Sequence, residues 1–151
     1  TERVKAWIEE AEAGGAKVAA GGELTGDGIL RPTVLTGVTD DMKVCALEVF
    51  GPVVAVATYT DYEDALARAN DSRYGLQAGV FTKDIQKAHR VIAQLEAGTT
   101  WINNYNITPI EMPFGGYKQS GIGRENSLVT LNHYTQVKSV YVEMGDVEAP
   151  Y

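Results

Sequence analysis

The sequence predicts an α/β fold with a largely parallel sheet flanked by helices. Helical and strand-like patterns alternate along the chain, which is typical of parallel strand pairing. Of the 151 residues, 44% are hydrophobic and 22% are charged, as in ordinary globular proteins. This length suits one domain with a sizeable core.

The first predicted element is a helix at the beginning of the chain. Val4, Ile8 and Ala11 follow helical spacing, while glutamates occupy the outer side. Gly14 and Gly15 then provide a stop signal. We therefore expect an amphipathic helix.

Strands are expected next. The valine-rich runs "AKVAAGG" and "ILRPTVLTGV" are typical of strands, and turn residues 26–28 separate them. Pro32 places the second strand near a sheet edge or marks its start. The run "VVAVATYT" after Pro52 predicts a further strand.

Helices and strands then alternate. Asp61 is a candidate N-cap for a helix that ends near Asn70, and "YGLQAGVFT" is typical of a strand. The segment "KDIQKAHRVIAQLEAG" predicts a helix with one apolar face that is closed by Gly98. "TTWIN" predicts another strand.

Residues 103–126 lose this periodicity and accumulate glycine, proline and asparagine, a pattern typical of a long ordered loop. Such loops usually carry function. "SLVTLNHY" then predicts a short helix, and the alternation of Val140, Val142 and Met144 predicts a terminal strand.

Charge and cysteine content narrow the function classes. The formal net charge of -7 argues against nucleic acid or an anionic membrane as partner, because both attract basic surfaces. The single cysteine, Cys45, excludes an internal disulfide, and we expect a small buried residue rather than a nucleophile. His89 and His133 lack metal-ligand spacing. Without a membrane-length apolar run or a signal-peptide pattern, a cytoplasmic protein is expected.

The glycine-rich stretch Pro113 to Glu125 could be a phosphate-binding loop. Lys118 is followed by Gln119, so a Walker loop does not fit, and the dinucleotide fingerprint lacks its third glycine. On the residues alone a tight connection is favoured, with Lys118 and Arg124 solvated. Nearby aromatic residues either line a pocket for an apolar or quaternary-ammonium ligand or merely pack within the loop. They are Trp101, Tyr105, Phe114 and Tyr117.

Glu48 is an acidic residue near the beginning of an otherwise strand-like run, "LEVFGPVVAV". A buried carboxylate without partners is costly, so this acid needs donors from the protein or from a ligand. The run alone does not show whether those hydrogen-bond donors belong to the protein or to a ligand.

Five blocks in order resemble the C-terminal part of the NAD(P)-dependent aldehyde dehydrogenases. They are "EVFGPV", "NDSRYGLQAGVFTKD", "LEAGTTWINNYN", "EMPFGGYKQSGIGREN" and "YTQVKSVYVEM", and the resemblance covers essentially the whole chain. Residues 101–125 and "VEMGDVEAP" are most similar to the betaine-aldehyde and 4-trimethylaminobutyraldehyde dehydrogenase branch.

The resemblance implies a cofactor role for the Glu-x-Phe-Gly-Pro motif. Glu48 matches the glutamate that accepts hydrogen bonds from the nicotinamide-ribose hydroxyls, and Phe50 matches the aromatic residue near the nicotinamide ring. Leu47 stands where the family commonly has a second acid. The choice between NAD and NADP depends on a domain that precedes this region in the family.

The resemblance also implies a substrate channel, a proton path and a cation site. Asn103, Tyr105 and Phe114 match the channel wall, and Glu125 matches an acid near the proton path. The backbone of Lys118 and Gly121 corresponds to a monovalent-cation site for an ion such as potassium.

The family's cysteine nucleophile, general base and cofactor domain lie upstream of this region, so we expect a fragment that is inactive alone. Residues 1–133 are expected to complete the catalytic domain, and residues 134–151 to form an oligomerisation strand and tail of a homo-oligomer. The alternative is a stand-alone binding or assembly module without catalysis. The opening at Thr1, without methionine and within a helical pattern, favours the fragment.

Overall fold

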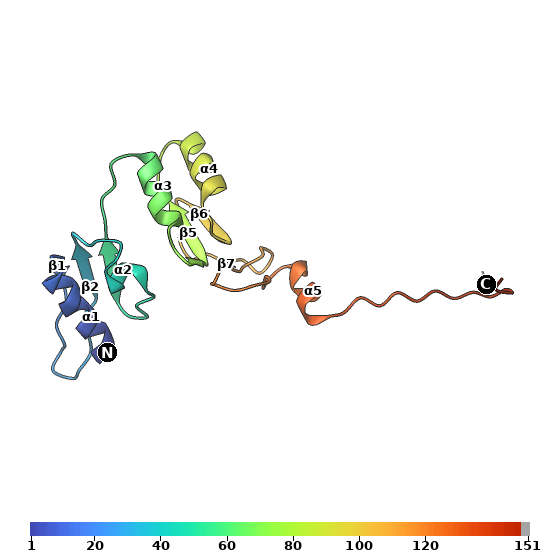
Figure 1. Cartoon of the computed structure of the whole chain (residues 1–151), viewed down its shortest axis with the longest axis horizontal. Helices are drawn as coiled ribbons and strands as arrows, with labels where there is room; N and C mark the ends of the chain where they lie inside the picture. Colours follow the sequence, from blue (N-terminus) through green and yellow to red (C-terminus); the bar gives the residue numbers. More distant parts are fainter. Residues whose placement is uncertain (149–151) are drawn as a thin grey trace. The chain divides into compact units, whose positions relative to one another are not determined.

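The computed structural model describes residues 1–148, and the chain folds as two compact units (Figure 1). The first unit is Thr1–Ser72, and the second begins at Arg73. No helix of the described residues has the length and apolar character needed to cross a membrane.

The first unit contains a sheet with the strand order β1-β2-β3, against which α1 and α2 pack. β1 and β2 are antiparallel, whereas β2 and β3 are parallel, with Thr33 opposite Val53. Its elements are α1 (Glu2–Ala13), β1 (Lys17–Ala20), β2 (Thr33–Thr36), α2 (Lys43–Ala46), β3 (Val53–Val56) and α3 (Tyr62–Asn70).

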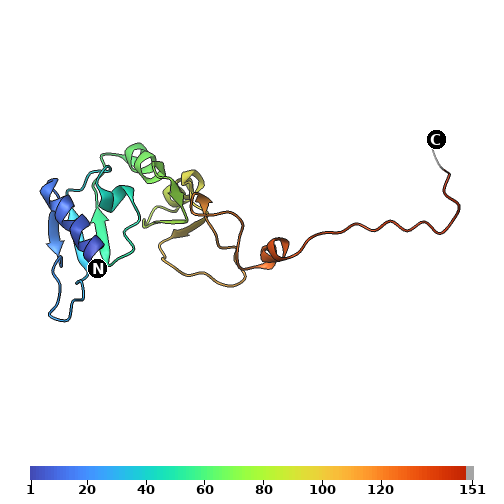
Figure 2. The ribbon, with the colours of Figure 1, turned by 60° about the horizontal axis from the view of Figure 1, so that its bottom comes forward.

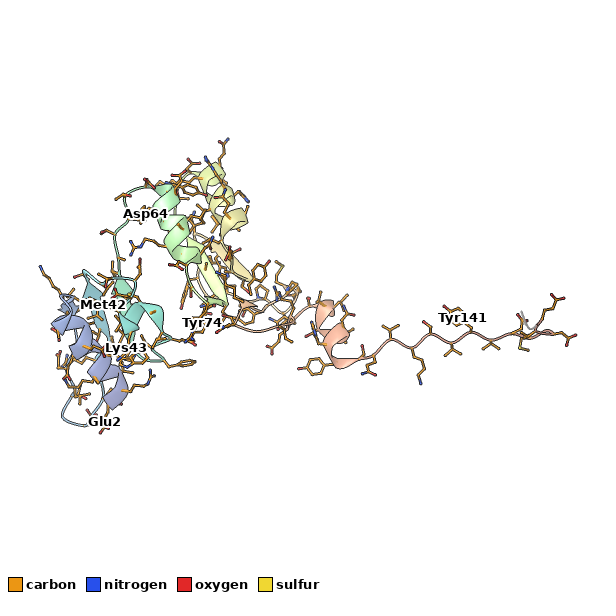
Figure 3. The ribbon with its side chains drawn as sticks, viewed as in Figure 1. Glu2, Met42, Lys43, Asp64, Tyr74 and Tyr141 are labelled. Carbon is orange, nitrogen blue, oxygen red and sulfur yellow. The ribbon has the colours of Figure 1, made fainter. Side chains whose placement is uncertain are left out.

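The core of the first unit confirms the predicted first helix. Val4, Ile8 and Ala11 are buried on one side of α1 and pack with Leu35 of β2, which is fully buried. α2, which the sequence pattern did not predict, lies against α1, and Figure 3 labels its residue Lys43. Lys43 is paired with Glu10. The packed core and the contact between α1 and α2 therefore hold in place the chain segment that follows α2.

The second unit contains two small sheets. β5 and β6 pair in parallel, with Gly79 opposite Trp101, and β4 and β7 pair antiparallel. Its elements are β4 (Tyr74–Gly75), β5 (Gln77–Val80), α4 (Ile85–Gln94), β6 (Thr99–Ile102), β7 (Tyr117–Lys118), the 3₁₀ helix η1 (Leu128–Thr130) and α5 (Leu131–Tyr134).

The helix boundaries largely follow the predicted signals. Asp61 caps α3 by accepting a hydrogen bond from the Asp64 N–H at 2.9 Å, as expected. The predicted closure of α4 at Gly98 is wrong, because the helix ends at Gln94 and Leu95 is already extended. Gly98 instead lies against the backbone of Gly115, where a side chain would not fit.

The α/β class is confirmed, with parallel and antiparallel pairs both present among the described strands. Pro32 immediately precedes β2, as expected for a strand start. The long loop includes the short strand β7, which the sequence pattern did not predict.

The predicted terminal strand at residues 140–144 is not formed within the described chain. After α5 the backbone runs on without helix or strand, as Figures 1 and 2 show, and Tyr141 on this segment is exposed (Figure 3). A strand requires a hydrogen-bonded neighbour, and the described residues supply none here. Residues 149–151 of the predicted oligomerisation segment lie outside the described residues.

Candidate functional site

Glu48 stands in a turn between α2 and β3, which we call the Glu48 turn (residues 47–52). The Leu47 N–H donates to the Lys43 carbonyl at 3.0 Å, and Arg3 Nη2 donates to the Val49 carbonyl at 2.7 Å. The Glu48 side chain is exposed, and no protein group within residues 1–148 hydrogen bonds to it or pairs with it. The backbone on both sides is therefore held while the carboxylate is available to a ligand.

Phe50 is the second unusual feature of this turn. Its side chain is 81% exposed, and its φ of 47° lies in the left-handed region. That conformation costs a non-glycine residue about 1–2 kcal/mol. At the next position, a Cβ added to Gly51 would lie 3.0 Å from Val4 Cγ2, so the backbone passes close to α1. An exposed acid and an exposed aromatic ring thus lie two residues apart on a constrained turn.

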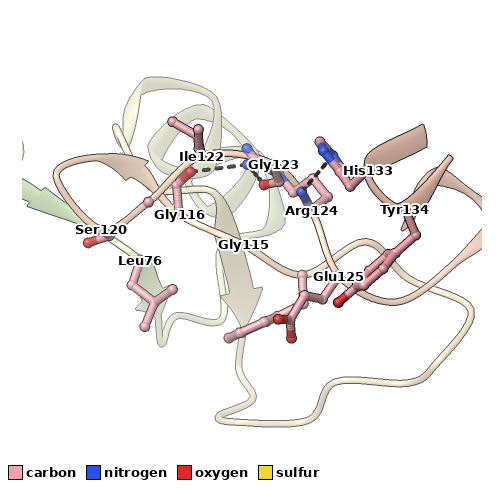
Figure 4. A pocket seen from close by; sticks show the side chains of 12 residues that line it. Leu76, Gly115, Gly116, Ser120, Ile122, Gly123, Arg124, Glu125, His133 and Tyr134 are labelled. Carbon is pink, nitrogen blue, oxygen red and sulfur yellow. Dashed lines mark hydrogen bonds between the residues drawn. The ribbon is translucent and has the colours of Figure 1, made fainter. Parts of the chain in front are cut away.

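The second unit contains a cavity of about 460 Å³ bounded by the glycine loop (residues 113–125) and α5. Figure 4 shows Arg124 at its wall, with Nη1 donating to the Gly116 carbonyl at 3.1 Å and to the Gly123 carbonyl at 2.6 Å. The Arg124 N–H donates to His133 Nε2 at 3.1 Å. Arg124 therefore closes the loop, and the expectation that it is merely solvated is wrong.

Lys118 also has a partner, since its Nζ lies 2.6 Å from Glu96 Oε2. Its φ of 52° is uncommon for a non-glycine residue, whereas the φ of 132° at Gly121 is one that glycine adopts readily. Among the described residues, no group of three or more His, Cys, Asp or Glu side chains could hold a metal ion. A cation site made of backbone oxygens at Lys118 and Gly121 stays a prediction.

Phe114 and Glu125, predicted for the substrate channel and the proton path, are brought together by the glycine loop. The Phe114 N–H donates to the Glu125 carbonyl at 2.9 Å, and the Glu125 N–H donates to the Phe114 carbonyl at 2.7 Å. Both residues line the first cavity, and Glu125 is labelled there in Figure 4. This pair of hydrogen bonds fixes the spacing between the backbones of an aromatic residue and an exposed acidic residue.

A second cavity of about 410 Å³ lies between β6 and the start of the glycine loop, with Trp101 and Phe114 in its lining. Trp101 Nε1 donates to the Ile107 carbonyl at 2.9 Å, which holds the indole in place. The Tyr105 ring lies 6.3 Å from the Trp101 ring, between centroids. Three of the predicted aromatic residues therefore gather in this part of the loop.

Asn103 has a local bonding role. Its Nδ2 donates to the Thr82 carbonyl and its Oδ1 accepts from the Thr82 N–H, both at 2.8 Å. These bonds tie the end of β6 to the segment that follows β5 and support the backbone φ of 52° at Asn103. Its place in a channel wall stays a prediction.

Cys45 is exposed, so the prediction of a buried cysteine is wrong. It lies in the short helix α2, which leaves one side open to solvent. Partial burial is the main cause that raises the pKa of the Cys45 thiol, and the negative charges of Asp40 and Asp41 add to it, against the lowering by Arg68. Because the thiolate is the nucleophilic form, this environment is poor for nucleophilic catalysis.

The sequence pattern does not predict two residues that hold the candidate sites in place. Arg3 reaches the Glu48 turn from 46 residues away, and His133 accepts from the glycine loop. The spacing of Arg3 and Trp7 by one helical turn is a weak signal for their cation–π contact, which has a distance of 4.5 Å. No pattern links His133 to Arg124.

These features define an α/β chain with an exposed acid–aromatic turn in one unit and a glycine loop with two cavities in the other. The chain belongs to the aldehyde dehydrogenase family, whose profile matches residues 1–140.

The chain is 54% identical to a betaine aldehyde dehydrogenase of Brucella anthropi over 99% of its own length and 32% of that protein. An aldehyde dehydrogenase from Bacillus cereus, solved as an NAD+ complex, has a TM-score of 0.89 and 50% identity over 95% of this chain and 30% of that one. For a Mycobacterium tuberculosis aldehyde dehydrogenase complexed with NAD+, the TM-score is 0.88 and the identity is 41%, over 97% and 31%. The chain thus spans about a third of the length of the curated relatives it matches.

Proposed function

We propose that this chain is the C-terminal part of an aldehyde dehydrogenase that oxidises an aldehyde to the carboxylic acid with NAD+. The observation that carries the proposal is the Glu48 turn. Its carboxylate is exposed and unpaired among residues 1–148, and the backbone bonds at Leu47 and Val49 hold it from both sides.

The chemistry of the turn fits the ribose end of a dinucleotide. An ionised carboxylate only accepts hydrogen bonds, and the two hydroxyls of a ribose donate them. Charge-assisted bonds of this kind are stronger than neutral ones. Phe50 adds an exposed apolar ring that can pack beside the nicotinamide. Bound NAD+ accepts the hydride, and the role of this chain is to orient the nicotinamide end of the cofactor.

For the substrate we propose a trimethylammonium aldehyde, either betaine aldehyde or 4-trimethylaminobutyraldehyde. Trp101 and Phe114 line the second cavity, the Tyr105 ring lies 6.3 Å from the Trp101 ring, and aromatic faces attract quaternary ammonium groups. The similarity to a betaine aldehyde dehydrogenase supports the same choice. Asn103 and Glu125 are proposed for the channel wall and the proton path, and the Lys118 and Gly121 backbones for a monovalent cation.

We further propose that the nucleophilic cysteine, the general base and the cofactor domain are supplied by another part of the protein. Cys45 is a poor candidate because its pKa is raised. We expect the isolated chain, given NAD+ and aldehyde, to produce no NADH. An NADH signal that disappears in Cys45→Ala would contradict this expectation.

A homo-oligomer built through the terminal segment is also proposed, with residues 1–133 completing the catalytic domain. Val140, Tyr141, Val142 and Met144 are all exposed, and such a mostly apolar row, interrupted by Glu143, suits a protein contact. The same row is the observation that favours the alternative function, a non-catalytic assembly module. Aldehyde oxidation by the full-length protein excludes that alternative.

The test of the cofactor role is Glu48→Gln in the full-length enzyme, with Glu23→Gln as a matched exposed control. Removing one charged hydrogen-bond acceptor costs about 1.5–3 kcal/mol, so the KM for NAD+ should rise ~10- to 150-fold. The control should leave it unchanged. An unchanged KM in Glu48→Gln would refute the ribose contact.

The test of the substrate class compares kcat/KM for betaine aldehyde with that for a neutral aldehyde of similar length. A cation–π contact that excludes water is worth about 2 kcal/mol, so a preference of roughly 30-fold for the cationic aldehyde is expected. Equal values would remove the trimethylammonium assignment while leaving the dehydrogenase proposal intact.

A further inference from the structure

We propose that Arg3 is a positioning residue for the cofactor contact of Glu48. The inference rests on the proposed function, since it assumes that Glu48 binds the nicotinamide ribose. Arg3 lies in the first turn of α1, and its guanidinium reaches the Glu48 turn 46 residues further along the chain. Its role is to hold the backbone conformation from which the Glu48 carboxylate reaches the ribose.

The contact falls on the peptide unit between the two cofactor residues. Arg3 Nη2 donates to the Val49 carbonyl oxygen at 2.7 Å, a short bond with a charged donor. The Val49 carbonyl and the Phe50 N–H belong to one planar peptide unit, so fixing the oxygen fixes the whole plane. That plane sets the orientation from which the backbone turns into the left-handed conformation at Phe50.

The Arg3 guanidinium is itself held in place. Its Cζ lies 4.5 Å from the centroid of the Trp7 ring, one helical turn further along α1. α1 is anchored in the core by the buried side chains of Val4 and Ile8, and Val4 also packs closely against Gly51. A continuous set of contacts therefore runs from the core through α1 to the Glu48 turn.

The Glu48 turn needs this restraint because its conformation is not the intrinsic preference of its residues. A phenylalanine at positive φ is strained and returns to the β region unless its surroundings prevent it. The Glu48 side chain supplies no restraint, since within residues 1–148 it has no protein partner. The Arg3 bond to Val49 acts at the point between these two residues.

The experiment measures kcat and KM for NAD+ and for the aldehyde in the full-length enzyme carrying Arg3→Ala, Arg3→Lys or the control Arg31→Ala. Arg31 is an exposed arginine paired with Glu23. Arg3→Ala should raise the KM for NAD+ about five- to tenfold and leave the KM for the aldehyde unchanged. Arg3→Lys should restore part of the affinity, because an ammonium can donate to the same carbonyl but is a point charge. Arg31→Ala should match the wild type.

A double-variant cycle then separates positioning from direct contact. If Arg3 acts through Glu48, adding Arg3→Ala to Glu48→Ala should change the KM for NAD+ by less than about twofold. Multiplicative effects of the two changes would show that Arg3 acts independently of Glu48 and would overturn its role as a positioning residue for Glu48. An unchanged KM in Arg3→Ala with a lowered Tm would show a merely structural role and overturn it too.

The cycle also distinguishes this inference from the proposed function. If Glu48→Ala raises the KM for NAD+ and Arg3→Ala does not, only the inference fails. If the wild-type enzyme shows no NAD+-dependent aldehyde oxidation, the proposed function fails and the inference fails with it.

Discussion

Replacement of Gly98 by alanine should destabilise the second unit severely. A Cβ at this position would lie 2.0 Å from the Gly115 carbonyl oxygen, and real Cβ atoms essentially never approach another atom closer than 3.0 Å. The backbones must therefore separate by at least the difference of 1.0 Å. The neighbouring atoms belong to the main chain, so no side-chain rotation relieves the clash.

The loss in free energy of unfolding caused by Gly98→Ala follows from the contacts that are broken when the Gly98 and Gly115 backbones move apart. The glycine loop loses its close approach to the start of β6, where Thr99 Oγ1 lies 3.4 Å from both the N and the O of Gly115. Overpacking that shifts the backbone costs typically 1–3 kcal/mol, and a clash of this depth belongs at the upper end, about 3 kcal/mol. With an m value of about 2 kcal/mol/M, the urea midpoint should fall by about 1.5 M.

The assay is urea unfolding followed by tryptophan fluorescence in a Trp7→Phe background. The chain has two tryptophans, Trp7 in the first unit and Trp101 in the second, so the remaining signal reports on the unit that contains Gly98. Gly79→Ala is the matched control, because its Cβ would meet only ordinary contacts at 3.7 Å. Midpoints within about 0.3 M of each other for Gly98→Ala and Gly79→Ala would refute the reasoning, since the expected difference is about 1.5 M.

The remaining predictions concern the first unit. Asp61→Ala should lower its stability by about 1 kcal/mol through loss of the α3 cap to Asp64, while Glu63→Ala in the same turn should have a smaller effect in urea unfolding. Asp40 accepts two hydrogen bonds from Arg68, which lower the pKa of Asp40 below its ordinary value of 3.8. The stability that this pair provides is therefore complete above pH 3.8 and lost as the pH falls through the lowered pKa. Urea midpoints measured from pH 6 to about pH 2 should show a steeper acid loss for the wild type than for Asp40→Asn, and parallel curves would contradict the pairing.

Local signals predicted much of the chain correctly. The spacing of Val4, Ile8 and Ala11 gave the buried face of α1, and Asp61 gave the start of α3. Helix hydrogen bonds and caps join residues a few positions apart, so a short window of sequence contains the information that determines them. The Glu48 motif was also recognised locally, from consecutive residues.

Errors arose where a partner distant in sequence decides the outcome. The terminal segment alternates like a strand, but a strand is completed by a neighbour that the described residues do not provide. Cys45 has apolar neighbours in sequence yet is exposed, because the short helix α2 covers only part of it. The sequence pattern predicts a helix stop at Gly98, whereas the close approach of the Gly115 backbone is what requires a glycine there.

The sequence by itself determined the α/β class, most helices and strands, and the residues that mark the aldehyde dehydrogenase family. Only the tertiary structure decided that Arg3 holds the Val49 carbonyl, that Arg124 closes the glycine loop against His133, and that Phe114 is bonded to Glu125. The physical reason is that local backbone preferences are encoded in adjacent residues, whereas contacts between distant segments exist only after the core has brought those segments together.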